Sequence, residues 1–373
     1  MNKRLSILVL ILSATLFAAS GFVYQANQTT PFPTEPKEVA TTSPTLPEIE
    51  IVPTVSLEEK VGQLFIIGHW ADSPLASTTN LIRKHHLGGV VIMSSPANAD
   101  DIKNWTSVWN KTSHRPLFIA IDQEGGQVSR LKGSAFIQTR QRDITNVEAA
   151  YEIGRTRGVE LEPLGINMNF APVLDSATNP NSFMYDRTFP TKASSAVLAS
   201  AMIQGMKEVS LIGVIKHFPG HDDTADDSHN ILPTVNIERA ELDTFASQFR
   251  ELINDQEPAA IMTAHILFPN IDTEPASLSL FFLTDYLRDE LGYNGLIITD
   301  DMSMKAITDT WNIEEASILA LQSGADIVLF AAEPNKTAAA LTAVIAAVET
   351  GQLSEERITE SYERAIALKE KIK

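Results

Sequence analysis

The segment Lys216–His229, KHFPGHDDTADDSH, places a lysine, three histidines and a run of aspartates directly behind a short apolar stretch. Histidine changes its charge near neutral pH, so a cluster of this kind is suited to proton transfer. Asp227 lies two residues before His229, where a carboxylate can bond one ring nitrogen and leave the other to carry a proton. We therefore predict that His229 is an acid/base group oriented by Asp227, the alternative being a solvated loop histidine.

A second candidate for chemistry is Asp300, which follows the apolar residues Ile297 and Ile298 in GLIITDD. Its carboxylate would emerge from a buried strand into a pocket that keeps water away, as a carboxylate nucleophile requires. A nucleophile of this type points to glycosyl transfer. On this motif alone, an equally good interpretation is that Asp300 or Asp301 caps the next helix.

Metal binding is the rival interpretation of the histidine cluster. The side chains that could ligate a divalent ion are His217, His221, Asp222, Asp223, Asp226, Asp227 and His229. Their spacing matches no recognised ligand motif such as a helical HExxH, and an acidic run in a loop is usually solvated. We therefore expect no metal site, with a metal-dependent TIM-barrel hydrolase as the alternative. Lys216 and His217 could donate hydrogen bonds to a ligand's oxygens, or could form a structural pair.

Eight short apolar runs could supply the strands that position these residues. They are Leu64–Gly68, Gly88–Ser95, Pro116–Asp122, Ile166–Asp175, Ile212–Gly220, Ala259–Pro269, Gly295–Asp301 and Ala325–Ala332. Segments of helical character separate most of them, with cap residues at Ser56, Gly292 and Asn312. Continuously apolar strands separated by helices indicate an α/β protein whose parallel sheet is covered on both faces.

Eight such units match the size of one (β/α)8 TIM-type barrel, with a doubly wound open sheet as the competing fold. Polar residues gather after four of the runs, in AIDQEGGQVSR, APVLDSATNPNSFMYDR, IKHFPGHDDTADDSH and IITDDMSMK. In a barrel these are the carboxyl ends of strands, where active sites form, so the four loops should converge on one pocket. Helices over 336–349 and 354–373 are expected to close a single domain.

Composition narrows the class of partner. The chain of 373 residues carries a formal net charge of −18, which argues against nucleic acid or an anionic membrane surface as a partner. It contains no cysteine, so disulfides, thiolate nucleophiles and cysteine-based zinc sites are excluded. We expect a monomer that binds a neutral or cationic ligand.

The amino-terminal region differs in composition from the rest. Residues 1–24 begin with Lys3 and Arg4, continue with the apolar run Leu5–Phe17, and predict a signal peptide or an uncleaved membrane anchor. Residues 25–55 form a Pro/Thr-rich, disordered linker, and the catalytic domain is expected over 56–373. The mature protein should therefore be exported: secreted, periplasmic, or anchored to the outer face of the cytoplasmic membrane.

These motifs resemble a known family. KHFPGHDDTADDSH is similar to the KHFPGHGxTxxDSH signature of family 3 glycoside hydrolases of the β-N-acetylglucosaminidase branch. IITDDMSMKAI resembles the nucleophile segment of the same family, and SLEEKVGQLFIIG, IDQEGGQVSRL, NFAPVLD and YDRTFP follow its order. The resemblance covers Ser56 to the carboxyl terminus.

The resemblance implies retaining hydrolysis of terminal β-linked N-acetylglucosamine on a TIM barrel, without metal or cofactor. By position, Asp300 resembles the family's nucleophile and His229 its general acid/base, with Asp227 orienting the imidazole. The same carry-over implies sugar ligands at Asp122, Arg130, Arg187, Lys216 and His217. The substrate would be a carbohydrate, either a peptidoglycan fragment or a chito-oligosaccharide.

One position departs from the family pattern. Asp222 occupies the place where the family usually has glycine, so the loop would be restricted if that place requires a positive φ. Aspartate tolerates this region better than most residues, so we expect altered loop behaviour or specificity and not lost activity. Besides the metal-dependent hydrolase, the remaining alternatives are an N-acetylglucosaminide phosphorylase of the same family and a non-catalytic sugar-binding module.

Overall fold

The computed structural model describes residues 55–372 except 97, 223, 225–227, 257 and 332–335. The predicted signal segment 1–24 and all of the predicted linker except Val55 lie outside the described residues. In the described part of the chain, no helix combines the length and the apolar character that a membrane span needs.

Eight parallel strands form a closed barrel in the order β1-β10-β9-β8-β7-β6-β3-β2. The strands are β1 (Phe65–His69), β2 (Gly89–Ile92), β3 (Phe118–Ile121), β6 (Met168–Asn169), β7 (Ile212–Phe218), β8 (Ala260–Thr263), β9 (Leu296–Asp301) and β10 (Ile327–Phe330). Because β1 pairs with both β2 and β10, the sheet has no edge, and the doubly wound alternative is excluded. The predicted (β/α)8 barrel is confirmed, with one strand in each of the eight apolar runs.

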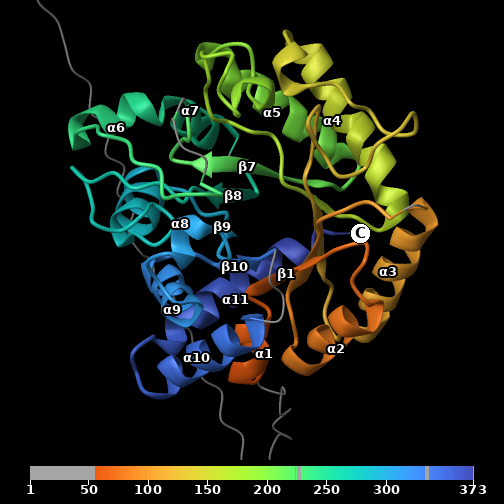
Figure 1. Ribbon diagram of the computed structural model, residues 1–373, viewed down its shortest axis with the longest axis vertical. Coiled ribbons are helices and arrows are strands. Elements are labelled where there is room, and N and C mark those ends of the chain that lie inside the picture. The colour runs from red at the N-terminus through yellow and green to blue at the C-terminus, as the bar shows by residue number, and fades with distance from the viewer. Residues whose placement is uncertain are drawn as a thin grey trace, which may run out of the picture. The chain divides into compact units, whose positions relative to one another are not determined.

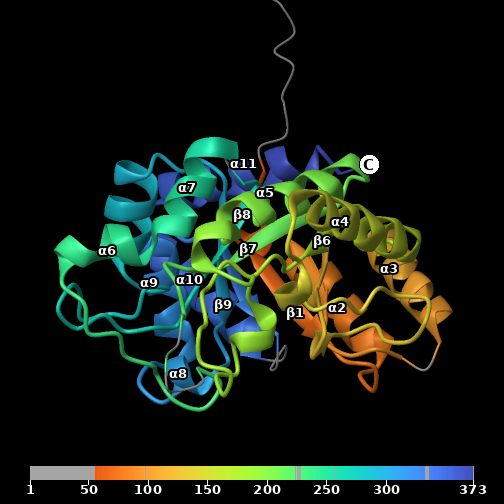
Figure 2. The same cartoon turned by 90° about the horizontal axis from the view of Figure 1, so that it is seen from above.

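Helices surround the strands as an outer layer, with α2, α3 and α4 on one flank and α6 and α9 on the other (Figures 1 and 2). The helices are α1 (Leu57–Gly62), α2 (Leu75–His85), α3 (Ala99–Thr112), α4 (Val147–Leu161), α5 (Lys192–Glu208), α6 (Arg239–Phe245), α7 (Ser247–Gln256), the π-helix η4 (Phe281–Glu290), α8 (Lys305–Thr308), α9 (Ile313–Ser323), α10 (Thr337–Glu349) and α11 (Glu355–Lys369). Among the described residues there are also three short 3₁₀ segments, η1 (Gln141–Asp143), η2 (Glu162–Leu164) and η3 (Tyr185–Arg187).

The expected caps determine where three of these helices begin or end. The Ser56 hydroxyl accepts from the N–H of Glu59, 3.2 Å away, at the start of α1. Asn312 accepts from the N–H of Glu315 at 2.8 Å at the start of α9. Gly292 follows the last turn of η4 with a φ of +67°, a conformation in which glycine carries no Cβ penalty.

Alternation along the strands builds two apolar layers. In β1, Ile66 belongs to the cluster inside the barrel, whereas Phe65 and Ile67 belong to the cluster between strands and helices. Successive strand residues point to opposite faces, so a strand covered on both faces is apolar throughout. Each such side chain contributes about 1.5–3 kcal/mol on burial. The strands therefore form a rigid support for the polar residues at their carboxyl ends.

Two local features differ from the expectation. The run Ile166–Asp175 contributes only a two-residue strand, β6, and from Phe170 onward it is a loop that pairs with β7 through one isolated parallel bridge, Val173 with Lys216. Pro172, which has no N–H to donate to a ladder, lies in this loop. A small antiparallel hairpin, β4 (Gln123–Gly125) with β5 (Val128–Ser129), follows β3 and was not predicted.

Candidate active site

A cavity of about 260 Å³ opens at the carboxyl ends of the strands. It is lined by seven of the eight side chains that the sequence singled out: Asp122, Arg130, Arg187, Lys216, His217, His229 and Asp300. The eighth, Asp227, lies outside the described residues. Larger grooves of about 850 and 700 Å³ lie near the starts of strands, and another of about 350 Å³ lies beside α9; none of them contains these residues. Chemistry, not size, therefore identifies the site.

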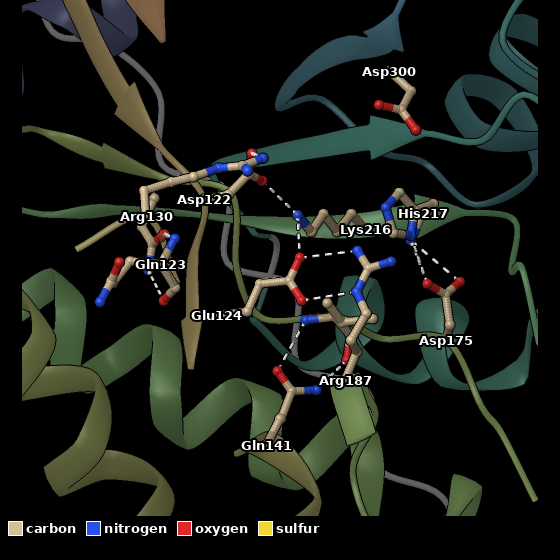
Figure 3. A network of polar contacts seen from close by, with 12 residues as sticks. Asp122, Gln123, Glu124, Arg130, Gln141, Asp175, Arg187, Lys216, His217 and Asp300 are labelled. Carbon is tan, nitrogen blue, oxygen red and sulfur yellow. Dashed lines mark hydrogen bonds and ion pairs between the residues drawn. The ribbon is translucent and has the colours of Figure 1, made fainter. Parts of the chain in front are cut away.

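Five charged side chains form a continuous chain of ion pairs along one wall of the cavity (Figure 3). Nζ of Lys216 lies 2.8 Å from Oδ1 of Asp122 and 2.6 Å from Oε1 of Glu124. Arg130 pairs with the other oxygen of Asp122 at 2.9 Å. Arg187 binds both oxygens of Glu124, each at 2.9 Å. The bidentate geometry fixes the plane of the Glu124 carboxylate relative to the Arg187 guanidinium.

The pKa shifts of the two carboxyl groups and of Lys216 keep these groups charged at neutral pH. Burial alone would raise the pKa of Glu124, but Arg187 and Lys216 more than offset it and hold that pKa below its usual range. Burial would likewise raise the pKa of Asp122, but the cations Lys216 and Arg130 outweigh burial and lower that pKa. Burial would lower the pKa of Lys216, but the two carboxylates raise it. Three cations face two carboxylates, so the wall retains one positive charge that suits electron-rich oxygens of a ligand.

His217 is held by Asp175, a buried residue in the loop after β6. Its Nδ1 donates to Oδ2 of Asp175 at 2.6 Å, because a carboxylate can only accept. Asp175 is fully buried and also accepts the backbone N–H of His221 at 2.6 Å. Burial raises the pKa of Asp175, but His217 and His221 outweigh it and keep the carboxylate ionised. Asp175 therefore fixes both the ring of His217 and the start of the loop that follows β7.

Asp300 lies at the end of β9, facing the cavity from a different wall (Figure 3). Burial alone would raise the pKa of Asp300, but the nearby His217 and His265 lower it by more. The carboxylate is therefore ionised at neutral pH. One oxygen accepts the N–H of Asp301 at 2.8 Å. His265 is itself fully buried and bonds Ser277 and the backbone oxygen of Asp301. These contacts orient Asp300 without neutralising it.

The capping alternative for this motif is wrong. The residue that precedes α8 is Met304, and it makes no side-chain cap hydrogen bond. The Asp301 carboxylate instead accepts the N–H of Ser303 at 3.0 Å and that of Ala331 at 2.9 Å. Asp301 therefore joins the ends of β9 and β10, and Asp300 is left facing the cavity.

His229 is exposed and lines the mouth of the cavity, on the loop that begins at His221. His221 is buried, and its Nε2 lies 3.4 Å from the Ser228 hydroxyl. Burial lowers the pKa of His221 to about 4, so this ring is neutral at physiological pH. Ser228, the residue before His229, therefore lies next to His221, the first residue of the loop.

The metal alternative finds no support in the described part of the chain, where no group of three or more His, Asp or Glu side chains is arranged around a common point. Asp223, Asp226 and Asp227, which the sequence offered as ligands, lie outside the described residues. His217, which lies in β7, donates from Nδ1 to Asp175.

Sequence reasoning missed three residues of the site: Glu124, Asp175 and His265. Each lies in a segment expected to be a strand or its following loop, so the strand-end position was the available signal. Glu124 also precedes the dipeptide Gly125-Gly126, where both residues have positive φ and a Cβ on Gly125 would lie 2.1 Å from the Thr139 oxygen. That turn folds the hairpin β4–β5 so that Glu124 points back at Lys216.

Comparisons with known proteins place the chain in a family. Residues 56–368 match the Glycosyl hydrolase family 3 N terminal domain. The chain is 32% identical to Beta-hexosaminidase A of Pseudoalteromonas piscicida over 79% of this chain, and it spans only 55% of that enzyme. It is 33% identical to a Beta-hexosaminidase of Nitrosomonas eutropha over 77% of this chain and 87% of that enzyme. The solved family 3 beta-N-acetylglucosaminidase of Paenibacillus superposes with a TM-score of 0.78 at 36% identity, covering 85% of this chain and 63% of that one.

Proposed function

Because this chain belongs to glycosyl hydrolase family 3, we propose that it is a retaining exo-acting β-N-acetylglucosaminidase. The single observation that carries the proposal is that Asp300, as an ionised carboxylate, and His229 line the same small cavity as the ion-paired wall. Both curated relatives reported above are named as hexosaminidases. The proposed substrate is a terminal non-reducing N-acetylglucosamine residue.

In the first step, an oxygen of Asp300 attacks the anomeric carbon and forms a covalent glycosyl ester. The bond from the anomeric carbon to the leaving oxygen breaks, and protonated His229 gives that oxygen its proton. In the second step, neutral His229 takes a proton from water, whose oxygen attacks the anomeric carbon and releases Asp300. The two inversions give net retention, and Asp300 and His229 return to their starting protonation states.

Histidine suits the acid/base role beside an aspartate nucleophile. Its conjugate base is neutral, so deprotonation adds no second negative charge near Asp300. Asp227, which precedes it by two residues, is proposed to set its tautomer.

The ion-paired wall is proposed to bind the sugar. Arg130, Arg187, Lys216 and His217 offer donors to hydroxyl and acetyl oxygens, and Asp122 offers acceptors to hydroxyl protons. Because these groups already bond one another, they are held in place before the ligand arrives, which lowers the ordering cost of binding. A cavity of about 260 Å³ is small among ligand pockets, which favours one sugar ring and therefore removal of terminal residues.

We further propose that the protein acts outside the cytoplasm as a monomer, on peptidoglycan fragments or chito-oligosaccharides. The charged amino-terminal run and the Pro/Thr-rich segment after it support export.

The decisive experiment is to trap the intermediate with a 5-fluoro N-acetylglucosaminide analogue, which keeps the N-acetyl group, and to locate the adduct by peptide mass. The label is expected on Asp300, and a label on any other residue would remove the assignment. Asp300→Asn should abolish turnover of an aryl β-N-acetylglucosaminide, whereas Asp309→Asn, an exposed aspartate nearby in sequence, should not.

Three further arms separate the alternatives. A glycosyl phosphate formed only in phosphate buffer would favour a phosphorylase over a hydrolase. Loss of activity with a chelator, with about one ion per chain, would favour the metal-dependent hydrolase. Binding of N-acetylglucosamine without turnover, unchanged in Asp300→Asn, would favour a sugar-binding module.

A further inference from the structure

Asp222, the residue that replaces the family's usual glycine, makes contacts that glycine has no side chain to make. Its φ is +43°, in the left-handed region that favours glycine. The side chain is directed back across the neighbouring loop, where Oδ1 accepts the N–H of Ser176 at 2.9 Å. Oδ2 pairs with Nζ of Lys192 at 3.2 Å. One carboxylate therefore joins the loop after β7, the loop after β6 and the first residue of α5.

Lys192 extends this connection to a further element. Its Nζ donates to the backbone oxygen of Phe245 at 2.6 Å and lies 5.2 Å from the centre of that ring. The Lys192 side chain is about a third exposed and the Asp222 side chain about a fifth, so water screens the pair only in part. Burial raises the pKa of Asp222 to about 6, with Lys192 opposing and Asp175 adding to the rise, so the pair is ionised at neutral pH.

Described residues connect Asp222 to the vicinity of His229. Asp222 directly follows His221, whose backbone N–H is held by Asp175. The His221 ring in turn approaches the hydroxyl of Ser228, the residue before His229, at 3.4 Å. The start of the loop and the residue before His229 are therefore both in contact with His221, which Asp175 holds in place.

We propose that Asp222 is a positioning residue that anchors the loop carrying His229 to the loop after β6 and to α5. It touches neither the cavity nor the reacting atoms, and it acts through His221 and Ser228. Its kinetic consequence rests on the proposed function, because that consequence requires His229 to be the proton donor. The anchor itself does not depend on any activity.

The kinetic test compares two aryl β-N-acetylglucosaminides, one with a 2,4-dinitrophenyl leaving group and one with a 4-methylphenyl leaving group. The value of kcat/KM reports the cleavage step, and only the poorer leaving group needs a proton from His229. Asp222→Gly, which restores the family residue, is expected to lower kcat/KM about tenfold on the 4-methylphenyl substrate and less than about twofold on the dinitrophenyl one. Asp222→Asn keeps the acceptor for Ser176 and should recover part of the loss.

A second measurement is independent of activity. Hydrogen exchange of the peptide spanning 221–230 should become faster in Asp222→Gly and also in Lys192→Met, which leaves that peptide's sequence unchanged. Asp100→Asn is the matched control, because it removes an exposed Asp–Lys pair of 3.0 Å on α3 and should leave this exchange unchanged.

The outcomes are distinguishable. If the wild-type protein cleaves neither substrate, the proposed function fails, and hydrogen exchange still decides whether Asp222 anchors the loop. Equal losses on both substrates, or unchanged exchange in both Asp222→Gly and Lys192→Met, would overturn the positioning role.

Discussion

Replacing Glu124 with glutamine tests whether the ion-paired wall holds the barrel end together. Glu124 is only 1% exposed, and it lies between Arg187 and Lys216, whose side chains are 10% and 3% exposed. Without its charge, the two cations face each other in a site that excludes most water. A glutamine side chain has nearly the same shape as glutamate, so the change removes charge and little packing.

Breaking a buried ion pair by removing one partner costs about 3–5 kcal/mol, because the remaining charge stays buried. Glutamine retains an amide oxygen as acceptor, which places this substitution near the lower figure, about 3 kcal/mol. In a domain of this size the thermal midpoint moves by about 1–2 °C per kcal/mol, so we expect a decrease of about 3–6 °C. We also expect KM to rise, because Lys216 and Arg187 lose the group that orients them.

The assay is thermal or urea unfolding of wild type, Glu124→Gln and Glu355→Gln. Glu355 is the matched control, because it pairs with Lys60 at 3.0 Å but is 61% exposed. An exposed pair of this kind contributes at most about 1 kcal/mol. The control should therefore lose less than about 2 °C.

The effect of pH gives this prediction a second check. The pKa of Glu124 is lower in the folded protein than its ordinary value of 4.5. Its stabilisation is therefore complete above pH about 4.5 and is lost as the pH falls through the lowered folded pKa. The difference between wild type and Glu124→Gln should shrink in acid. Equal stability of the two variants at pH 7, or a difference that grows in acid, would refute the reasoning.

Three further predictions concern other parts of the molecule. Burial lowers the pKa of Lys369 to about 7, and its ammonium group donates to Gln63 at 2.6 Å. Because the folded pKa lies below the unfolded one, the folded protein loses stability as the pH falls from about 10 to 7. Lys369→Met should therefore raise the urea midpoint at pH 6 and lose this advantage by pH 10, and a pH-independent difference would contradict it. The ring of His221, with a pKa of about 4, should show constant NMR shifts between pH 8 and 5.5, and a titration midpoint above 5.5 would rule out its neutral state. Asn312→Ala should cost about 1 kcal/mol by removing the cap of α9, and an unchanged unfolding midpoint would show that the cap contributes nothing.

Much of the fold was predictable because its signals are local. A strand buried on both faces must be apolar at every position, and eight such runs are visible in the chain. The hydroxyl of Ser56 and the amide of Asn312 cap helices through bonds to residues three positions away, which sequence spacing reveals directly. The hairpin β4–β5 was not predictable in the same way, because its strands are two or three residues long and carry polar residues.

In the candidate site, too, some features were predictable from the sequence and others were not. The sequence predicted that polar side chains would gather at strand ends and which chemical groups they would carry. Asp300 and Lys216 were identified in this way. Glu124 was overlooked because a single glutamate in a loop is usually solvated. Its importance appears only once Lys216 and Arg187 are placed on either side of it.

The sequence by itself determined the barrel, the residues at its carboxyl end and the chemistry those residues could perform. Only the tertiary structure decided how they are paired: Lys216 with Asp122 across 94 positions, Arg187 with Glu124 across 63, and His217 with Asp175 across 42. The physical reason is that an ion pair or hydrogen bond depends on separations of about 3 Å. Closure of the barrel sets those separations between strand ends that lie far apart in the chain.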